Sequence, residues 1–113
     1  MAESALHRFK AEFFKALSHP LRLAILDSLR KGEKSVGQLV AELNADQPAV
    51  SQQLSILRQR GFVETRKEGT TIFYRTADPE VYVFLDLGRT IFERQLAQSG
   101  EMLAQIRREV GSR

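Results

Sequence analysis

The sequence contains no cysteine and no tryptophan, and it has only three prolines among its 113 residues. Without cysteine, the chain can form no disulfide, hold no metal through thiolates and sense no oxidant through a thiol. It also lacks any run of about 18 uncharged apolar residues, the length that a membrane-spanning helix requires. These absences exclude a disulfide-stabilised domain, a thiol-based sensor and a membrane protein, so we expect no membrane partner.

The start of the chain lacks the uninterrupted apolar stretch of a secretory signal, because Glu3, Arg8 and Lys10 interrupt it. We therefore expect a cytoplasmic protein. A length of 113 residues is typical of one folded domain, so we expect a single domain over residues 1–113. The sequence offers no nucleophile with its base, no phosphate-binding loop and no cluster of metal ligands. We expect neither catalysis nor a cofactor.

The net charge of +3 is small, but the positive charge is concentrated in one segment. Residues 58–76 hold five cations and two acids, a surplus equal to that of the whole chain. The cations are Arg58, Arg60, Arg66, Lys67 and Arg75, and the acids are Glu64 and Glu68. A basic segment of this kind permits a polyanionic partner such as DNA.

Apolar residues at helical spacing predict an amphipathic helix over residues 6–17. Phe14 widens its apolar face, and two interpretations stay open for this residue: a wide core face or a contact between two chains. A second helix is predicted to follow, with Ser18 as its N-cap and Pro20 in its first turn. This helix is expected to end near Gly32, which suits a left-handed cap.

Two capping patterns predict a helix-turn-helix over residues 35–60. Ser35 and Gln38 have the spacing of a capping box, and Asp46 is the expected cap of the second helix. The outward face of that second helix is unusual, because exposed faces normally hold Glu and Lys, which favour helices more than Ser does. Here the outward residues are small or amide-bearing and uncharged: Gln47, Ala49, Ser51, Gln52 and Ser55.

Two β-prone runs, residues 62–66 and 71–75, predict a β-hairpin, which we call the wing and place at residues 62–76. A final helix is predicted over residues 79–110, and its apolar stripe keeps one phase across Ser99-Gly100, which we interpret as a kink or a fraying point rather than an end. The predicted fold is mainly α with a small β-hairpin, a winged helix-turn-helix of order α-α-α-α-β-β-α.

Two stretches resemble the ArsR/SmtB family of dimeric bacterial repressors: FKALSHPLRLAILDSL at residues 14–29 and QPAVSQQLSILRQRGFVETRKEGTTIFY at residues 47–74. Asp46 stands where the family often has serine, which exchanges one good helix cap for another. The resemblance implies a transcriptional repressor that binds a palindromic operator in double-stranded DNA as a homodimer.

The predicted DNA contacts fall into two groups. The major groove admits an α-helix, and there Gln pairs with adenine while Ser donates to or accepts from any base. The predicted base-reading residues, which match the family's base contacts, are Gln47, Ala49, Ser51 and Gln52. The predicted contacts to the DNA backbone are Ser35, Ser55, Arg58, Arg66, Lys67, Gly69 and Thr70. Arg75 is instead expected to pair with Glu64 across the hairpin, and Glu68 opposes the DNA charge.

A dimer is expected because one helix of this kind covers only half of an operator, and half-sites usually lie roughly 34 Å apart. In the resembling family the terminal helices make the dimer, which here implies residues 1–17 and 79–110 and a symmetric interface. The predicted interface residues are Leu6, Phe9, Phe13, Phe14, Phe84, Ile91 and Phe92.

Both metal sites common in the resembling family lack their ligands. Ser35-Val36-Gly37 occupies the place of a C-x-C pair, and Asp86 is followed by Gly88 where a second site needs histidine. We therefore expect no metal, although carboxylates from two subunits around a harder ion stay an alternative. The signal is open among three choices: an unidentified organic effector between terminal helices, a protein partner, or none.

A winged helix that docks proteins is the competing class. An exposed apolar face on the second helix of the helix-turn-helix, or a neutral wing, would favour this class. Ile56 is the only large apolar residue of that helix outside its buried stripe, and the wing is basic. The sequence therefore predicts DNA binding.

Overall fold

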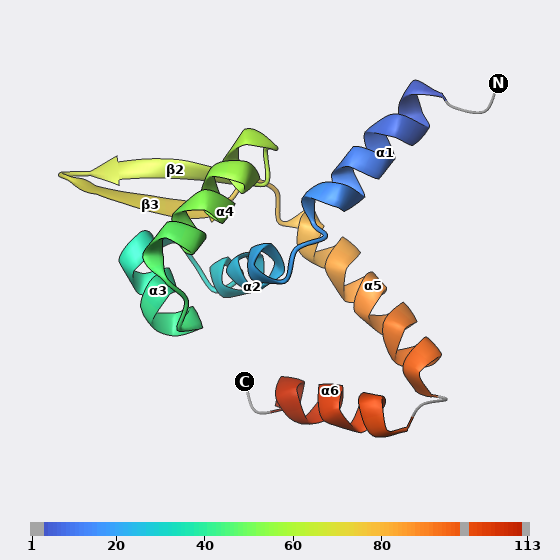
Figure 1. The fold of residues 1–113 in the computed structure, drawn as a ribbon. Helices are drawn as coiled ribbons and strands as arrows, with labels where there is room; N and C mark the ends of the chain where they lie inside the picture. Colours follow the sequence, from blue (N-terminus) through green and yellow to red (C-terminus); the bar gives the residue numbers. More distant parts are fainter. Residues whose placement is uncertain (1–3, 98–99, 112–113) are drawn as a thin grey trace. The chain divides into compact units, whose positions relative to one another are not determined.

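The computed structural model describes residues 4–97 and 100–111 (Figure 1). The chain divides into two compact units, Met1–Pro79 and Glu80–Arg113. The first unit contains α1 (Ala5–Ala16), α2 (Pro20–Leu29), β1 (Lys34–Ser35), α3 (Val36–Leu43), α4 (Gln47–Gln59), β2 (Val63–Glu68) and β3 (Thr71–Thr76). The second contains α5 (Glu80–Leu96) and α6 (Glu101–Gly111).

The core of the first unit lies where α2, α3 and α4 pack against one another. Its fully buried side chains are Ile25 and Leu26 from α2, Leu39 from α3, and Val50, Leu54 and Leu57 from α4. Burying one such side chain contributes about 1.5–3 kcal/mol. The spacing of the three α4 residues confirms the buried stripe expected from the sequence, and it leaves the opposite face of α4 exposed.

The start of α2 differs from the prediction. Ser18 is not its N-cap, since its hydroxyl donates to the Lys15 carbonyl oxygen at 2.7 Å and so belongs to the end of α1. The cap is His19, whose Nδ1 accepts from the amide of Leu21 at 3.1 Å. The physical reason is that only three residues, Leu17, Ser18 and His19, separate α1 from α2, so the Ser18 hydroxyl is used by the first helix. Pro20 occupies the first turn as expected.

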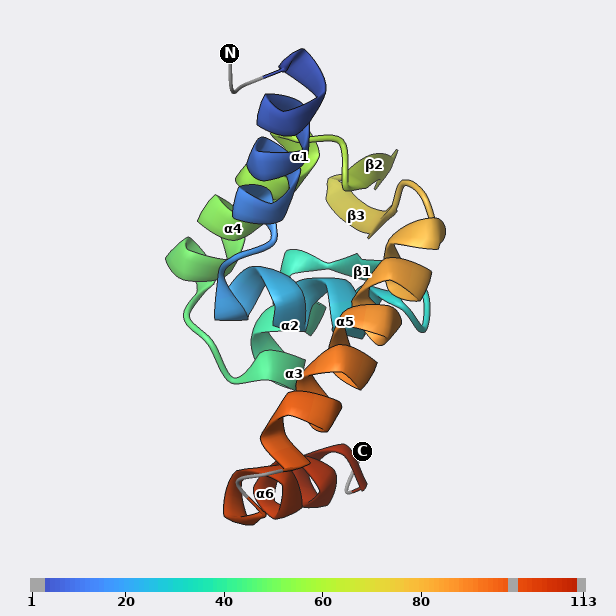
Figure 2. The same ribbon diagram turned by 90° about the vertical axis from the view of Figure 1, so that its right-hand side faces the viewer.

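The hairpin is confirmed, but it belongs to a sheet of three strands rather than two. β1 pairs antiparallel with β3, with Lys34 opposite Tyr74 and Ser35 opposite Phe73 (Figure 2). The order in the sheet is β1-β3-β2. A strand of two residues has no detectable alternation, which is why the sequence did not reveal it.

The second unit corrects the prediction of one kinked final helix. α5 ends at Leu96 and α6 begins at Glu101, so the segment holds two helices. Gly100 has φ +30°, a conformation that glycine adopts at little cost, whereas Ser99 lies outside the described residues. The continuous apolar phase was misleading because two separate helices can keep the same phase across a break. Neither of them, nor any other helix of the described residues, is long and apolar enough to span a membrane.

The observed architecture is a mainly helical winged helix-turn-helix, which confirms the predicted fold class, with β1 and the split final helix as additions to the predicted order.

Candidate DNA-binding surface

The orientation of α4 is set by contacts at both of its ends. Asp46 caps the N-terminus, its Oδ1 accepting from the amide of Ala49 at 2.8 Å, which confirms the predicted cap. The turn before it relies on Asn44, a non-glycine residue in the left-handed region with φ 51°. At the other end Gly61 has φ +82°, a conformation that leads the chain out of the helix towards the wing.

The face of α4 opposite the core is exposed and uncharged. Gln47, Ser51, Gln52 and Ser55 are exposed, and Ala49 is half-buried between them. These are the residues that the sequence predicted to face DNA, so the helix brings them together on one surface. Arg58 is exposed in the last turn of the same helix.

Gln53 is the exception among the glutamines of α4. It is buried, and its Oε1 has no hydrogen-bond partner among the described residues. Gln53 therefore does not belong to the exposed face of α4.

Arg66, one of the two wing cations predicted to contact DNA, is held by acidic side chains of the same chain. The Arg66 Nε lies 3.2 Å from both carboxylate oxygens of Glu33, and its Nη1 donates to Glu68 Oε2 at 2.7 Å. The guanidinium also lies over the Phe73 ring, 4.8 Å from the centroid. The hydrogen bond from Arg66 holds the pKa of the Glu33 carboxyl below its usual value, and the two carboxylates raise the pKa of Arg66. Arg66 is therefore engaged by acids in the free protein.

Lys67 differs from its neighbour. It is exposed, and the described part of the chain records no ion pair for it. Gly69 has φ +62° at the hairpin turn, where a residue with a Cβ would be strained, and the exposed Thr70 follows it. Arg75 donates to Glu64 Oε1 at 2.7 Å, which confirms the predicted pair across the hairpin.

The N-terminus of α3 is closed by the predicted capping box. The Ser35 amide donates to Gln38 Oε1 at 2.8 Å, and the Gln38 amide donates to Ser35 Oγ at 3.2 Å. Lys34 next to it donates to Ser28 Oγ at 2.8 Å and also pairs with Glu42. The two contacts of Lys34 attach β1 to both α2 and α3. Hydrogen bonds from Lys34 and from Ser28 hold the pKa of the Glu42 carboxyl below its usual value.

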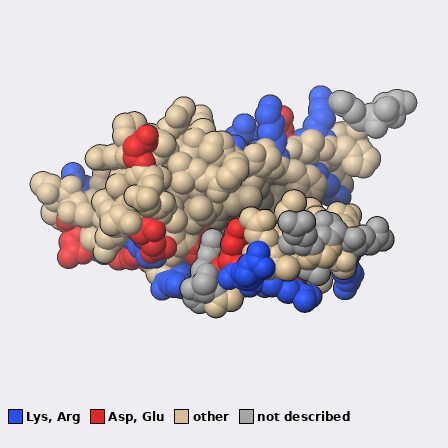
Figure 3. Space-filling view, turned by 60° about the horizontal axis from the view of Figure 1, so that its bottom comes forward, with Lys and Arg blue, Asp and Glu red and all other residues tan. Residues whose placement is uncertain are grey.

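Charge is unevenly distributed over this region. The space-filling view shows a largely uncharged surface over the half that holds the hairpin, α3 and α4, with acidic side chains at its lower edge (Figure 3). Two cations of residues 58–76 pair with acids from elsewhere in the chain, Arg60 with Glu12 and Arg66 with Glu33. The sequence did not point to Glu33, the acid that pairs with Arg66. It precedes Arg66 by 33 positions, and no local pattern connects two residues so far apart.

The residues predicted to form the dimer lie on two separate units. On α1, Leu6, Phe9 and Phe14 are exposed, Phe9 to 72%, whereas Phe13 is half-buried against Phe62 with ring centroids 5.2 Å apart. The exposure of Phe14 contradicts the wide-core interpretation for this residue. On α5 the exposed members are Phe84, Ile91 and Phe92, and Val83 and Leu87 add to the same exposed apolar set.

Among residues 4–97 and 100–111, no three His, Asp or Glu side chains lie close enough together to hold a metal ion.

Comparison with known proteins places this fold among bacterial regulators. Residues 19–65 match the family model described as bacterial regulatory protein, arsR family. An uncharacterised HTH-type transcriptional regulator of Mycobacterium tuberculosis is 35% identical over 108 residues, which is 95% of each chain. A biofilm growth-associated repressor of Agrobacterium fabrum is 44% identical over 82 residues, covering 73% of this chain and 70% of that one.

Solved structures agree with the sequence matches. The crystal structure of the same M. tuberculosis protein superposes with a TM-score of 0.77 at 36% identity, covering 86% of this chain and 98% of that one. A Mycobacterium bovis structure, described as a homodimeric winged helix-turn-helix DNA-binding domain, gives a TM-score of 0.72 at 32% identity, covering 87% and 95% of the two chains.

Proposed function

Because this chain belongs to the ArsR family and is a DNA-binding transcriptional regulator, we propose that it acts as a repressor that binds a palindromic operator as a homodimer. The observation that carries the proposal is the exposed, uncharged face of α4 on a helix whose other side is fully buried. Such a face is costly for helix formation and fits the floor of a major groove.

Base reading is assigned to Gln47, Ala49, Ser51 and Gln52. Gln binds adenine through two hydrogen bonds, Ser donates to or accepts from several bases, and the small Ala49 permits close approach of the helix to the groove. The exposure of Gln47, Ser51 and Gln52, with the half-buried Ala49 between them, supports this assignment.

Contacts to the DNA backbone are assigned to residues around this face. The Ser35 hydroxyl keeps its proton for donation to a phosphate because it only accepts in the capping box. Lys67 is exposed on the wing and supplies positive charge to the DNA backbone. Arg66 supplies less, because its guanidinium is paired with two carboxylates. The remaining contacts in this assignment are Ser55, Arg58, Gly69 and Thr70, with Arg66 in a secondary role.

Dimer formation is supported by the exposed apolar residues of α1 and α5 and by the relative that is described as homodimeric. Exposed aromatic side chains in such number are unusual for a monomer and typical of an interface. Two copies would supply the two recognition helices that a palindrome requires. One domain of 113 residues, with residues 35–60 as reading unit and 62–76 as wing, stays part of the proposal.

Fluorescence anisotropy with DNA from upstream of the protein's own gene tests the proposal. We expect binding at least about a thousandfold tighter than to random DNA of equal length, falling steeply with salt. Equal binding to both DNAs would contradict operator recognition. A reporter fused to the bound promoter tests the direction of control: expression should fall when the protein is present, and a rise would identify an activator.

A further inference from the structure

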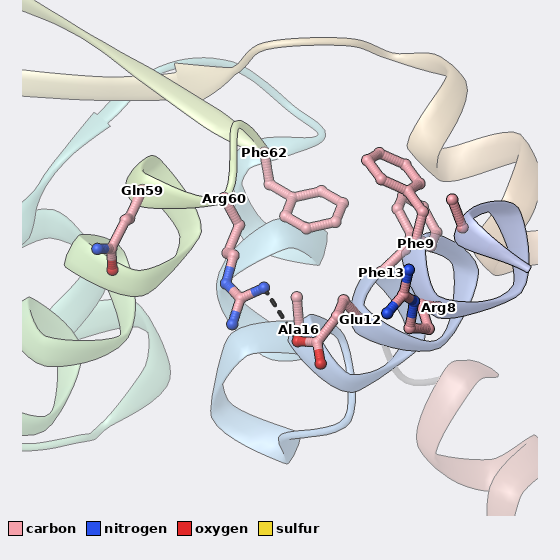
Figure 4. A pocket seen from close by; sticks show the side chains of 9 residues that line it. Arg8, Phe9, Glu12, Phe13, Ala16, Gln59, Arg60 and Phe62 are labelled. Carbon is pink, nitrogen blue, oxygen red and sulfur yellow. Dashed lines mark hydrogen bonds and ion pairs between the residues drawn. The ribbon is translucent and has the colours of Figure 1, made fainter. Parts of the chain in front are cut away.

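A pocket of about 470 Å³ lies in the first unit between α1 and the end of α4 (Figure 4). Its volume is in the range of small-molecule sites, about 300–1,000 Å³. Its lining consists of Ala5, Arg8, Phe9, Glu12, Phe13 and Ala16 from α1, and Gln59, Arg60 and Phe62 from the end of α4 and the residues after it. None of these residues belongs to the face of α4 assigned to base reading.

The walls of the pocket are apolar. Figure 4 shows Phe62 facing Phe9 and Phe13 across the space, and Phe13 and Phe62 are in ring contact with centroids 5.2 Å apart. Phe9 keeps most of its surface exposed. An apolar ligand body inserted here would cover aromatic surface that now meets water, which is favourable in proportion to the area covered.

The rim of the pocket has a positive surplus. Glu12 and Arg60 form an ion pair at 3.3 Å, so their charges largely cancel. Arg8 is exposed, and the described part of the chain records no ion pair for it. A guanidinium without a carboxylate beside an apolar cavity favours a ligand that carries one negative group, because Arg binds carboxylates through two parallel hydrogen bonds.

The position of the pocket connects it to the DNA-binding surface. Gln59 is the last residue of α4, and Phe62 lies between Gly61 and the first residue of β2. The wall opposite α1 is therefore the junction between α4 and the wing. A ligand that moves α1 away from Phe62, or that displaces Glu12 from Arg60, would alter contacts at this junction. Because α4 ends at the junction and the wing begins there, the position of both would change.

We propose that this pocket binds an amphipathic organic anion, an aromatic or aliphatic carboxylate, whose carboxylate pairs with Arg8 and whose apolar body packs between Phe9 and Phe62, and that binding weakens the hold on operator DNA. The second part rests on the proposed function. Phe9 is also a predicted dimer contact, so a second copy of this chain is the competing occupant of the pocket.

The binding test uses the full chain and isothermal titration with 1-naphthaleneacetate, and compares the neutral 1-naphthaleneethanol. We expect the acid to bind about tenfold more tightly than the alcohol, and Arg8→Gln to weaken binding of the acid about tenfold while leaving the alcohol unchanged. Lys10→Gln is the matched control, since it removes the same charge from α1 outside the pocket lining. Equal effects of the two substitutions, or no preference for the acid, would overturn the site.

A second variant, Ala5→Phe, fills the pocket from an exposed position in the first turn of α1 without removing a core side chain. We expect it to abolish binding of the acid, while circular dichroism and sedimentation show an unchanged fold and oligomeric state. Ala5→Phe that binds the acid as the parent does would overturn the proposal. So would a parent dimer that binds no acid, since a second copy then covers the pocket.

The regulatory test measures operator affinity with and without saturating 1-naphthaleneacetate. We expect at least about a fivefold loss, within the usual range for coupling between two sites, and no loss in Ala5→Phe. Tight operator binding that ignores the bound acid would refute the coupling and leave the proposed function standing. Absence of operator binding even without the acid would refute the proposed function itself.

Discussion

Two parts of the first unit, α4 and the wing, are proposed to contact DNA, and their polar side chains differ in charge and in pairing. On α4 the exposed groups from Gln47 to Ser55 are uncharged, and the described residues record no ion pair for them. On the wing, Arg66 is held by Glu33 and Glu68, and Arg75 by Glu64. The difference teaches that the number of cations in a segment does not measure the charge available to DNA, because acids in the free protein compete for it. Under the proposed function, sequence choice therefore falls to α4, and Lys67 supplies most of the unpaired positive charge that the described part of the wing offers to DNA.

The largest effect should come from removing the polar face of α4. Ser51→Ala combined with Gln52→Ala should weaken operator binding about 100-fold, since each good base contact contributes about 1–3 kcal/mol of discrimination. Binding to random DNA should hardly change. Anisotropy titrations on both DNAs measure this, and Gln53→Ala is unsuitable as a control because Gln53 is buried. Gln95→Ala, on the exposed surface of α5, is the better control.

Loss of the cap of α4 should have the next largest effect. Asp46→Ala leaves the amide of Ala49 without its acceptor and should lower the free energy of unfolding by about 1 kcal/mol. Urea denaturation measures the change. Asp46→Ser keeps an acceptor at the same position and should retain most of the stability. Equal losses in both variants would show that the cap does not hold the helix that carries the base-reading face.

On the wing, Lys67→Ala should weaken binding roughly threefold to fivefold on operator and random DNA alike, and should reduce the salt dependence by about one counterion. Affinities measured at several salt concentrations give this slope. Arg75→Ala, which removes an internally paired cation from the same hairpin, should change the slope less. A larger change for Arg75→Ala would contradict the distinction between free and paired charge.

Glu33→Gln tests the same distinction between free and paired charge by releasing a paired cation instead of removing a free one. Removal of this carboxylate frees one side of the Arg66 guanidinium for phosphate, so random-DNA affinity should rise roughly twofold at low salt. Asp27→Asn, with the same charge change on α2, is the matched control and should raise it less. Weaker binding in Glu33→Gln would mean that the carboxylate orients the wing rather than occupying its arginine.

The smallest effect should appear in the pH dependence of stability. The pKa of Glu33 in the folded protein lies below its ordinary value of 4.5, so the ionised carboxylate stabilises the fold above that pH. The contribution is lost as the pH falls through the lowered pKa. The thermal midpoint of Glu33→Gln should therefore lie slightly below that of the parent at pH 7, and the gap should close as the pH falls through the lowered pKa. A gap that persists at low pH would contradict the assignment.

Local patterns predicted most of the fold because local chemistry determines it. The capping box at Ser35 and the cap at Asp46 each involve residues a few positions apart. Helical spacing likewise predicted which residues of α4 face outward, and the burial of Leu54 confirms which side of the helix faces the core.

What the sequence did not predict depends on contacts between distant segments. β1 exists only because β3 pairs with it, and Glu33 acquires a role only because the hairpin brings Arg66 beside it. The pocket has the same origin, since it forms between α1 and residues about 50 positions later in the chain, such as Arg60 with Glu12 at a separation of 48. The break at Gly100 was missed because periodicity reports phase and not continuity.

The short strand β1 has a mechanical consequence. It joins the N-terminus of α3 to β3, the middle strand of the sheet, and Lys34 attaches it further to α2 and α3. These contacts hold the base of the hairpin to the helical part of the first unit. We therefore expect the distance between α4 and the wing to change little when the protein binds DNA. DNA whose local twist shifts the phosphates relative to the bases would satisfy one element and miss the other, so this protein should discriminate among operators by their twist as well as by their bases.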